Sequence, residues 1–225
     1  MNVPSQADTI LDMALELGES SGWHALRLHD VADALQLPLT GVHACFASKD
    51  DLAEAWFDRA DRTALAVRDH AGFSALSERS RLATVIMAWL DTLSPHRRVT
   101  RDMLGYKLEP GHIHLQALGI MRISRTVQWF MEAVQIDLTG PRRILMEISL
   151  TTVYLSTFAH WLFDDSPGSR ETRRHLDAAL QRLDKLAGRG RSRTATKDPH
   201  PAAGHRGTAA GNSTGEDPPA PMMTH

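Results

Sequence analysis

Apolar residues recur at three- and four-residue spacing along most of the chain up to residue 187, and this period constrains the fold most strongly. In the first stretch, the spaced positions are Ala7, Ile10, Leu11, Ala14 and Leu17. Such spacing places side chains on one face of an α-helix, whereas a half-buried strand alternates with a period of two. No run alternates in that way, and no Asn-Gly turn joins two strands. The sequence therefore predicts an all-α fold.

Capping and helix-breaking residues predict the helix boundaries. Gly22 ends the first helix, and a short second helix over 28–35 is stopped by the segment 36–38 before a third helix over 39–46. Ser48 is expected to cap a fourth helix, whose first turn carries two aspartates that suit the helix dipole. Longer helices are predicted at 77–93, 97–104, 112–136, 142–163 and 167–186.

Three regions follow from composition and from these helices. We expect a head at 1–48, a helical body at 49–187 and a tail at 188–225. The last body helix has Ser166 as its expected cap and Pro167 at its first position. The tail contains no Leu, Ile, Val, Phe or Trp, so it lacks the apolar area that would offset the entropy of ordering, and we expect it to be disordered.

Charge and cysteine content exclude several classes of protein. The 225 residues carry 25 Lys and Arg against 27 Asp and Glu, a net charge of -2 that does not favour binding of bulk nucleic acid by the whole surface. The single Cys45 excludes an internal disulfide framework and a multi-cysteine zinc site, and we expect it to be a small, partly buried side chain. The first twenty residues carry four acids and no base, which does not fit a secretory signal. We expect a cytoplasmic protein.

The segment 144–163 is apolar almost all round, which raises the alternative of a membrane span. Glu147 and His160 lie within it, together with five serine and threonine residues. A span needs about 20 predominantly apolar residues with few charges, so this segment is too polar. A helix buried in the core or in a dimer interface is the preferred interpretation, and no integral membrane span is expected.

The first three predicted helices form a helix-turn-helix pattern, since a proline-containing turn joins the second to the third. The stretch from Ile10 to Phe57 combines an amphipathic first helix, Gly22-Trp23, Asp30-Val31-Ala32, and Phe46 followed by Ser48-Lys49-Asp50-Asp51-Leu52. This pattern resembles the DNA-binding domain of the TetR family of transcriptional regulators. The resemblance implies a third helix that enters the major groove of an operator in double-stranded DNA and a second helix that braces it.

Carried over residue by residue, the resemblance assigns candidate DNA contacts. Arg27 and His29 fall beside the DNA backbone, and Lys49 falls where the family usually keeps a phosphate-contacting lysine. The remaining candidates lie at the start of the third helix or within it; they are Pro38, Thr40, Gly41 and His43. This helix departs from the family pattern because, among its candidates, only Thr40 and His43 offer polar side-chain groups to base edges. A solvated helix face is the alternative interpretation of those two residues.

Two observations favour a second interpretation. Residues 1–62 hold eleven acids and four bases, a net charge of -7 that suits the phosphate backbone poorly. The segment 152–186 is similar to the C-terminal region of the ubiquinone-biosynthesis accessory protein, a lipid-binding relative of TetR proteins that does not regulate transcription. The matching residues are Tyr154, Thr157, Trp161, Leu162, Asp165, Ser166, Pro167, Thr172, Leu176 and Asp177. That family's additional membrane-docking helix is not expected here, because the predicted tail begins instead.

Both resemblances imply that the middle helices enclose an apolar molecule, either a small effector or a lipid. The candidate lining residues are Trp89, Met103, Tyr106, Met121, Arg125, Trp129, Tyr154 and Phe158. Aromatic residues and methionines at helical spacing also form ordinary protein cores, which is the alternative for each of them. Arg122 and Arg125 are candidates to pair with an acidic ligand head group, although a surface salt bridge is the preferred interpretation.

Enzyme chemistry has little support in this sequence. HExxH, GxSxG and glycine-rich phosphate-loop motifs are absent. His112 and His114 are two residues apart, so on a helix they point to different sides and make poor joint metal ligands. We therefore expect no enzyme activity, no cofactor and no metal.

Two hypotheses remain. The first is a TetR-like regulator that binds operator DNA as a homodimer formed through 142–163 and 167–186, controlled by a small apolar or amphipathic effector. The alternative is a lipid- or quinone-binding accessory protein that keeps the fold and does not bind DNA.

Overall fold

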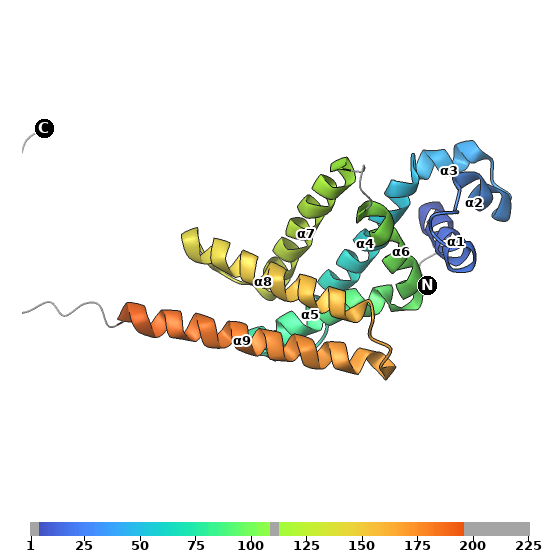
Figure 1. The fold of residues 1–225 in the computed structure, drawn as a ribbon. Coiled ribbons are helices and arrows are strands. Elements are labelled where there is room, and N and C mark those ends of the chain that lie inside the picture. Colours follow the sequence, from blue (N-terminus) through green and yellow to red (C-terminus); the bar gives the residue numbers. More distant parts are fainter. Residues whose placement is uncertain (1–4, 109–112, 196–225) are drawn as a thin grey trace, which may run out of the picture. The chain divides into compact units, whose positions relative to one another are not determined.

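The computed structural model describes residues 5–108 and 113–195, and the regular structure in this part of the chain consists of helices, without a strand. Its α-helices are α1 (Gln6–Ser21), α2 (Leu28–Ala34), α3 (Leu39–Cys45), α4 (Lys49–Ala66), α5 (Glu78–Leu93), α6 (Arg97–Leu108), α7 (Ile113–Val134), α8 (Gly140–Trp161) and α9 (Arg170–Ala195). Short 3-10 turns lie at Val67–Asp69, Phe73–Ala75, Ser94–His96 and Pro167–Ser169. Figure 1 shows their arrangement, and the predicted all-α fold is confirmed.

The α1–α4 bundle packs around one continuous core. Ile10, Leu11 and Ala14 of α1 are buried, as the sequence period predicts, and Trp23 in the following loop is buried with them. Helix α4 begins as expected at the cap Ser48, whose Oγ accepts a hydrogen bond from the Asp51 N–H at 3.2 Å. Asp51 in turn accepts from the Ser48 N–H, which completes a capping box.

Helix α4 connects the head to the body, because it buries residues along its whole length. Leu52 and Trp56 lie in its N-terminal half, and Ala60 and Ala64 in its C-terminal half, where it packs against α5 and α7. Head and body residues up to Gly188 consequently belong to one compact unit, Met1–Gly188, and the second unit is Arg189–His225.

Helix α1 also packs closely against α6. Gly18 faces Val99, and an added Cβ at Gly18 would lie 3.2 Å from Val99 Cγ1 and 3.3 Å from Trp23 Cε3. The Glu19 carboxylate accepts a hydrogen bond from the Val99 N–H at 3.4 Å, and the Glu19 carbonyl accepts one from Arg98 at 3.3 Å. The absence of a side chain at Gly18 therefore allows α6 to lie against the head.

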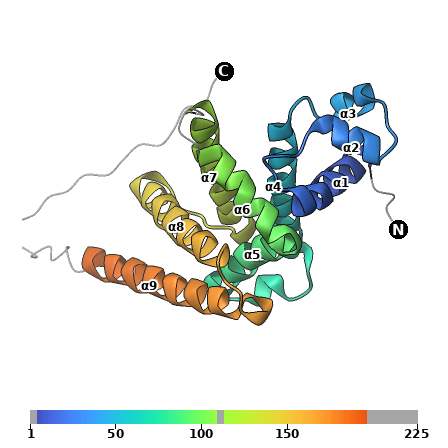
Figure 2. The ribbon, with the colours of Figure 1, turned by 45° about the vertical axis from the view of Figure 1, so that its right-hand side comes forward.

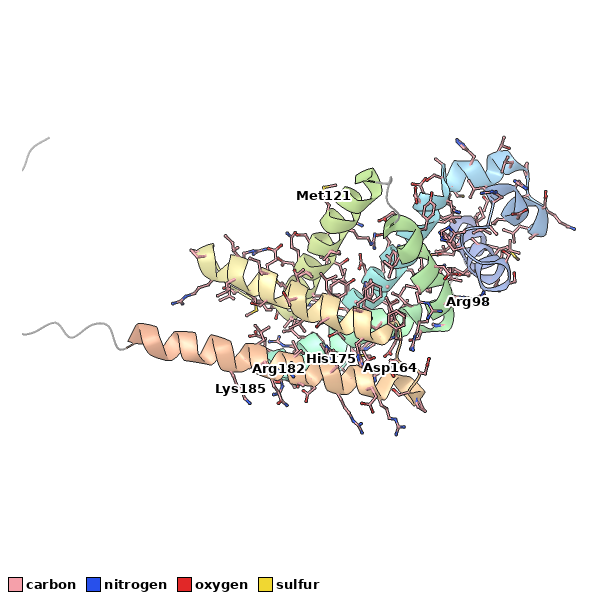
Figure 3. All side chains as sticks on the ribbon, in the orientation of Figure 1. Arg98, Met121, Asp164, His175, Arg182 and Lys185 are labelled. Atoms are coloured by element: carbon pink, nitrogen blue, oxygen red, sulfur yellow. The ribbon has the colours of Figure 1, made fainter. Side chains whose placement is uncertain are left out.

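Helices α8 and α9 lie side by side and run in opposite directions in both ribbon views (Figures 1 and 2). The loop between them is fixed by Asp164 (Figure 3), whose carboxylate accepts hydrogen bonds from the Ser166 N–H at 2.8 Å and the Thr172 N–H at 2.9 Å.

The last helix differs from the prediction at both ends. Gly168 has φ 64° and the segment Pro167–Ser169 forms a 3-10 turn, so α9 begins at Arg170. Helix α9 continues to Ala195, so the first eight residues of the predicted tail are helical, and 196–225 lie outside the described residues.

No helix in the described ranges 5–108 and 113–195 is long and apolar enough to cross a membrane.

Candidate nucleic-acid interface and interior site

The turn between α2 and α3 is closed by two backbone hydrogen bonds. The Leu37 N–H donates to the Ala32 carbonyl at 2.9 Å, and the Gln36 N–H donates to the Asp33 carbonyl at 3.1 Å. Gln36 has φ 53°, the left-handed conformation that this kind of helix ending requires and that glycine adopts at least cost. The turn thus ends α2 at Ala34 and lets α3 begin at Leu39, after four intervening residues.

Helix α3 presents one side to solvent and one side to the core. Val42 is fully buried and holds the helix against α1 and α2, while Thr40 and His43 are exposed. Pro38, the residue before α3, is exposed, and Gly41 is half-buried. The structure therefore brings the four candidates together at α3, with both hydrogen-bonding side chains accessible.

Arg27 and His29 flank the start of α2, and both are exposed. The Arg27 N–H donates to the Asp30 carboxylate at 3.0 Å, which caps the helix. The His29 Nε2 lies 3.3 Å from the same carboxylate. Asp30 therefore takes part in the local structure of this turn.

Lys49 is the candidate whose surroundings differ most from the expectation. Its ammonium group donates to the carbonyls of Trp23 and His24 at 3.1 and 3.3 Å and lies 5.0 Å from the centre of the Tyr106 ring. Burial lowers the pKa of Lys49, and the nearby Arg27 lowers it further. Lys49 thus joins the start of α4 to the α1–α2 loop and to α6, and its contact with a DNA phosphate stays a prediction.

The acidic residues of 1–62 are largely engaged within the protein. Asp30 and Asp51 cap helices, and Glu19 accepts from α6. The others with partners form ion pairs: Asp8 and Asp12 with Arg59, and Glu54, Asp58 and Asp61 with Arg122. Eight of the eleven acids therefore have defined partners; of the partners just named, only Arg122 adds a positive charge from outside residues 1–62.

An aromatic cluster fills the centre of the body. Trp89 of α5 makes edge-to-face contacts with Tyr154 and Phe158 of α8 at centroid distances of 5.4 and 5.3 Å, and it stacks on Phe57 of α4 at 6.0 Å. Phe130 of α7 contacts Tyr154 at 5.5 Å. The structure thus brings together three of the candidate effector residues: Trp89, Tyr154 and Phe158.

The other candidate effector residues lie elsewhere. Met103 is buried on α6, and Tyr106 lies at the junction with the head, beside Lys49 and His24. Met121 and Trp129 are 62% and 47% exposed on α7, and Figure 3 shows Met121 on the outer side of that helix. Arg125 is exposed and pairs with Asp58 at 3.1 Å. The face of α7 that carries these three residues is turned outward because Val127, Phe130 and Met131 occupy the core.

A buried polar network lies beside the aromatic cluster, and sequence reasoning missed it. Arg122 donates to Asp61 at 3.0 Å, to Asp58 at 2.8 Å and to Glu54 at 2.7 Å, although a surface salt bridge was the preferred expectation. Asp61 also accepts from the Trp89 indole N–H at 2.7 Å and from the Thr126 hydroxyl at 3.1 Å. Burial raises the pKa of Asp61, while Arg122, Trp89 and Thr126 oppose that rise. A signal for the network existed in the acids at positions 54, 58 and 61, which share one face of α4.

An open groove of about 330 Å³ lies between α5 and α9 and is lined in part by Ala83, Met87, Ala88, Arg173 and Leu176. Arg173 pairs across it with Asp91 at 2.7 Å. None of the candidate effector residues lines this groove.

In the part of the chain that the structure describes, no three His, Cys, Asp or Glu residues gather as metal ligands, and His112 lies outside that part.

A helix-turn-helix with an exposed third helix, joined through α4 to a helical body, is the architecture of a class of DNA-binding regulators. The chain is 44% identical to the TetR transcriptional regulator from Nitrosomonas europaea ATCC 19718; the match covers 78% of this chain and 95% of that one, with a TM-score of 0.71. The chain belongs to the TetR family of transcriptional regulators.

More distant structures share the fold alone. A TetR regulator from Rhodococcus sp. RHA1 is 17% identical, with 76% of this chain and 93% of that chain covered and a TM-score of 0.55. A regulator from Aquifex aeolicus VF5 is 14% identical, with 80% and 99% covered and a TM-score of 0.56. No family model matches the chain, and no curated protein does.

Proposed function

We propose that this protein controls transcription by binding operator DNA through α3, with the head 1–48 reading the duplex and the body 49–187 binding an effector and forming a homodimer. The observation that carries the proposal is the exposed side of α3, where the side chains of Thr40 and His43 are both accessible. Pro38 and Gly41 lie beside them, and Arg27, His29 and Lys49 are the proposed backbone contacts. Binding to chromosomal DNA would place the protein in the cytoplasm.

The proposed dimer is supported by an apolar seam on α8. Leu145 and Ile148 are 66% and 59% exposed, and Leu155 is exposed as well. With Thr152 and Ala159, both also exposed, these positions follow a spacing of three and four residues, which lines up one face of a helix for packing against another. A two-fold dimer would bury this seam and carry two copies of α3 to successive major grooves of a near-palindromic site.

The proposed effector is small and apolar or amphipathic, and its supporting feature is the aromatic cluster of Phe57, Trp89, Tyr154 and Phe158. Phe57 belongs to α4, the helix that begins with Lys49, and it stacks on Trp89, which joins it to Tyr154 and Phe158. A molecule that separates the rings would shift α4 and thereby change the population of the DNA-binding arrangement. This function needs binding groups and no catalytic group.

The alternative, a lipid- or quinone-binding accessory protein, is not favoured by the identity to a TetR regulator over most of the chain.

Fluorescence-anisotropy titration of the full chain against fragments of its own promoter region tests the proposal. Unrelated duplex serves as competitor, and two salt concentrations separate backbone contacts from base contacts. Thr40→Ala and His43→Ala should alter specific binding, whereas Thr63→Ala and His70→Ala, at exposed positions outside α3, should leave it unchanged. If no fragment binds in preference to the competitor, or if all four variants bind like the wild type, the assignment of α3 as the reading helix is overturned.

A further inference from the structure

The exposed side of α3 is largely hydrocarbon. Besides Thr40 and His43, it presents Leu39, which is 53% exposed, and Ala44. Three of these four side chains, those of Leu39, Thr40 and Ala44, carry a methyl group. Neither Leu39 nor Ala44 is among the DNA contacts that the family resemblance implies.

The side chains of α3 limit how it can distinguish base pairs. Guanine is commonly recognised by Arg or Lys and adenine by Asn or Gln, through paired hydrogen bonds in the major groove. None of these four residue types occurs in Leu39–Cys45. The C5-methyl group of thymine is a further feature that distinguishes bases in the major groove, and apolar side chains contact it.

We propose that α3 recognises its operator by C5-methyl groups, with Leu39 and Ala44 packed against thymines of one half-site. The inference rests on the proposed function and adds the chemistry of the site that α3 reads. Leu39 and Ala44 are five residues apart, about 7.5 Å along the helix axis. Base pairs are separated by about 3.4 Å, so the two side chains can reach thymines about two steps apart.

Thr40 and His43 complete this arrangement. Their hydroxyl and imidazole groups lie between the two apolar contacts on the same side of α3 and supply the hydrogen bonds that fix the register. Leu39 in the free protein exposes its side chain to water, and contact with a thymine methyl group removes that apolar area from water. The gain on binding therefore depends on the methyl group itself and not only on the hydrogen-bonding edge of the adenine-thymine pair.

Substitution of deoxyuridine for thymidine tests this directly, because it removes the C5-methyl group and keeps the hydrogen-bonding pattern. The full chain first selects its duplex from a random pool, and each thymine of the selected half-site is then replaced in turn. We expect one or two positions at which replacement weakens wild-type binding about three- to tenfold. At the position contacted by Leu39, Leu39→Ala should bind the two duplexes equally, and at a position contacted by Ala44 it should still discriminate. Leu76→Ala, an exposed leucine outside the head, should discriminate like the wild type at both.

A duplex with 5-methylcytosine at the sensitive position, paired with guanine, distinguishes the source of the methyl group. Weaker binding there than to thymine supports thymine as the natural ligand, and equal binding assigns recognition to the methyl group alone and overturns the choice of thymine. Specific binding that no uracil replacement weakens overturns the inference and leaves the proposed function standing. If no duplex is enriched by selection, the proposed function and this inference are both overturned.

Discussion

Arg122 of α7 lies against Asp61 of α4, with its Nη2 atom 3.0 Å from the carboxylate Oδ2, and both side chains are buried. The ion pair joins α4, which begins next to the head, to α7, which contributes Phe130 to the aromatic cluster. Because Asp61 also accepts from Trp89, the carboxylate holds α4, α5 and α7 together through hydrogen bonds.

Removal of one partner should leave an uncompensated charge in the interior. Arg122→Met is expected to lower the free energy of unfolding by about 3–5 kcal/mol. The double variant Asp61→Asn/Arg122→Met should recover part of that loss, because it removes the stranded carboxylate. Arg125→Met is the matched control, since Arg125 forms an exposed ion pair with Asp58 and should cost no more than about 1 kcal/mol. Urea unfolding measures all three, and equal losses for Arg122→Met and Arg125→Met would contradict the buried role.

Lys49 should contribute to stability as well as to the proposed DNA contact. Lys49→Met retains most of the aliphatic stem but loses both hydrogen bonds to the α1–α2 loop, so we expect a loss of about 1–3 kcal/mol in the free energy of unfolding. Lys185→Met, at an exposed position on α9, is the control and should be close to neutral. Thermal or urea unfolding measures the loss of stability in the two variants. A Lys49→Met variant as stable as Lys185→Met would show that the ammonium contacts do not hold the head to the body.

Asp164 should make stability depend on pH in the acid range. Although burial by itself would raise the pKa of Asp164, hydrogen bonds from Ser166 and Thr172 hold it well below its ordinary value of 3.8. The unfolded chain therefore takes up a proton at higher pH than the folded protein, so this contribution is complete above pH 3.8 and is lost as the pH falls below that value. Asp164→Asn should cost about 1–3 kcal/mol at neutral pH.

Unfolding measured from pH 7 down to pH 3 checks this expectation. The difference between wild type and Asp164→Asn should narrow as the solution becomes more acidic. Asp165→Asn, at the exposed neighbouring position, should follow the wild type over the whole range. A difference that stays constant with pH would show that the Asp164 carboxylate is not the titrating group.

The seam on α8 should determine the oligomeric state. Ile148→Glu places a charge in the middle of the proposed two-fold contact and should convert the dimer to a monomer at micromolar concentration. Met121→Glu introduces the same charge at a similarly exposed residue of α7 and should leave the dimer intact. Sedimentation velocity distinguishes monomer from dimer for each variant. A dimer that persists in Ile148→Glu would place the contact on a different surface.

Local signals account for what the sequence predicted well. The cap at Ser48 and the stop at Gln36 depend on residues within one turn of each other, and both were confirmed. The start of α9 was displaced to Arg170 because Gly168 adopts a left-handed conformation, and sequence alone does not show which conformation a glycine takes. The helix predicted at 142–163 begins two residues earlier, at Gly140, with Pro141 in its first turn.

Packing between distant helices accounts for what the sequence did not predict. Helix α7 has apolar residues on several sides, so its period does not decide whether Trp129 or Phe130 faces the core. Arg122 was expected at the surface because the acids that neutralise it lie more than sixty residues earlier in the chain. The DNA candidates came from the family resemblance, which did not include Leu39, and its exposure follows from the way Val42 packs α3 against α1 and α2.

The engagement of the charged residues near the head has a kinetic consequence for the proposed regulator. Residues 1–62 carry four basic side chains, and the structure uses two of them internally, Lys49 on backbone carbonyls and Arg59 on Asp8 and Asp12. With few free basic side chains, residues 1–62 would release few counterions on meeting an unrelated duplex, so we expect weak non-specific binding. If the proposed function holds, we therefore expect the protein to reach its operator mainly by repeated collisions from solution and less by sliding along the duplex.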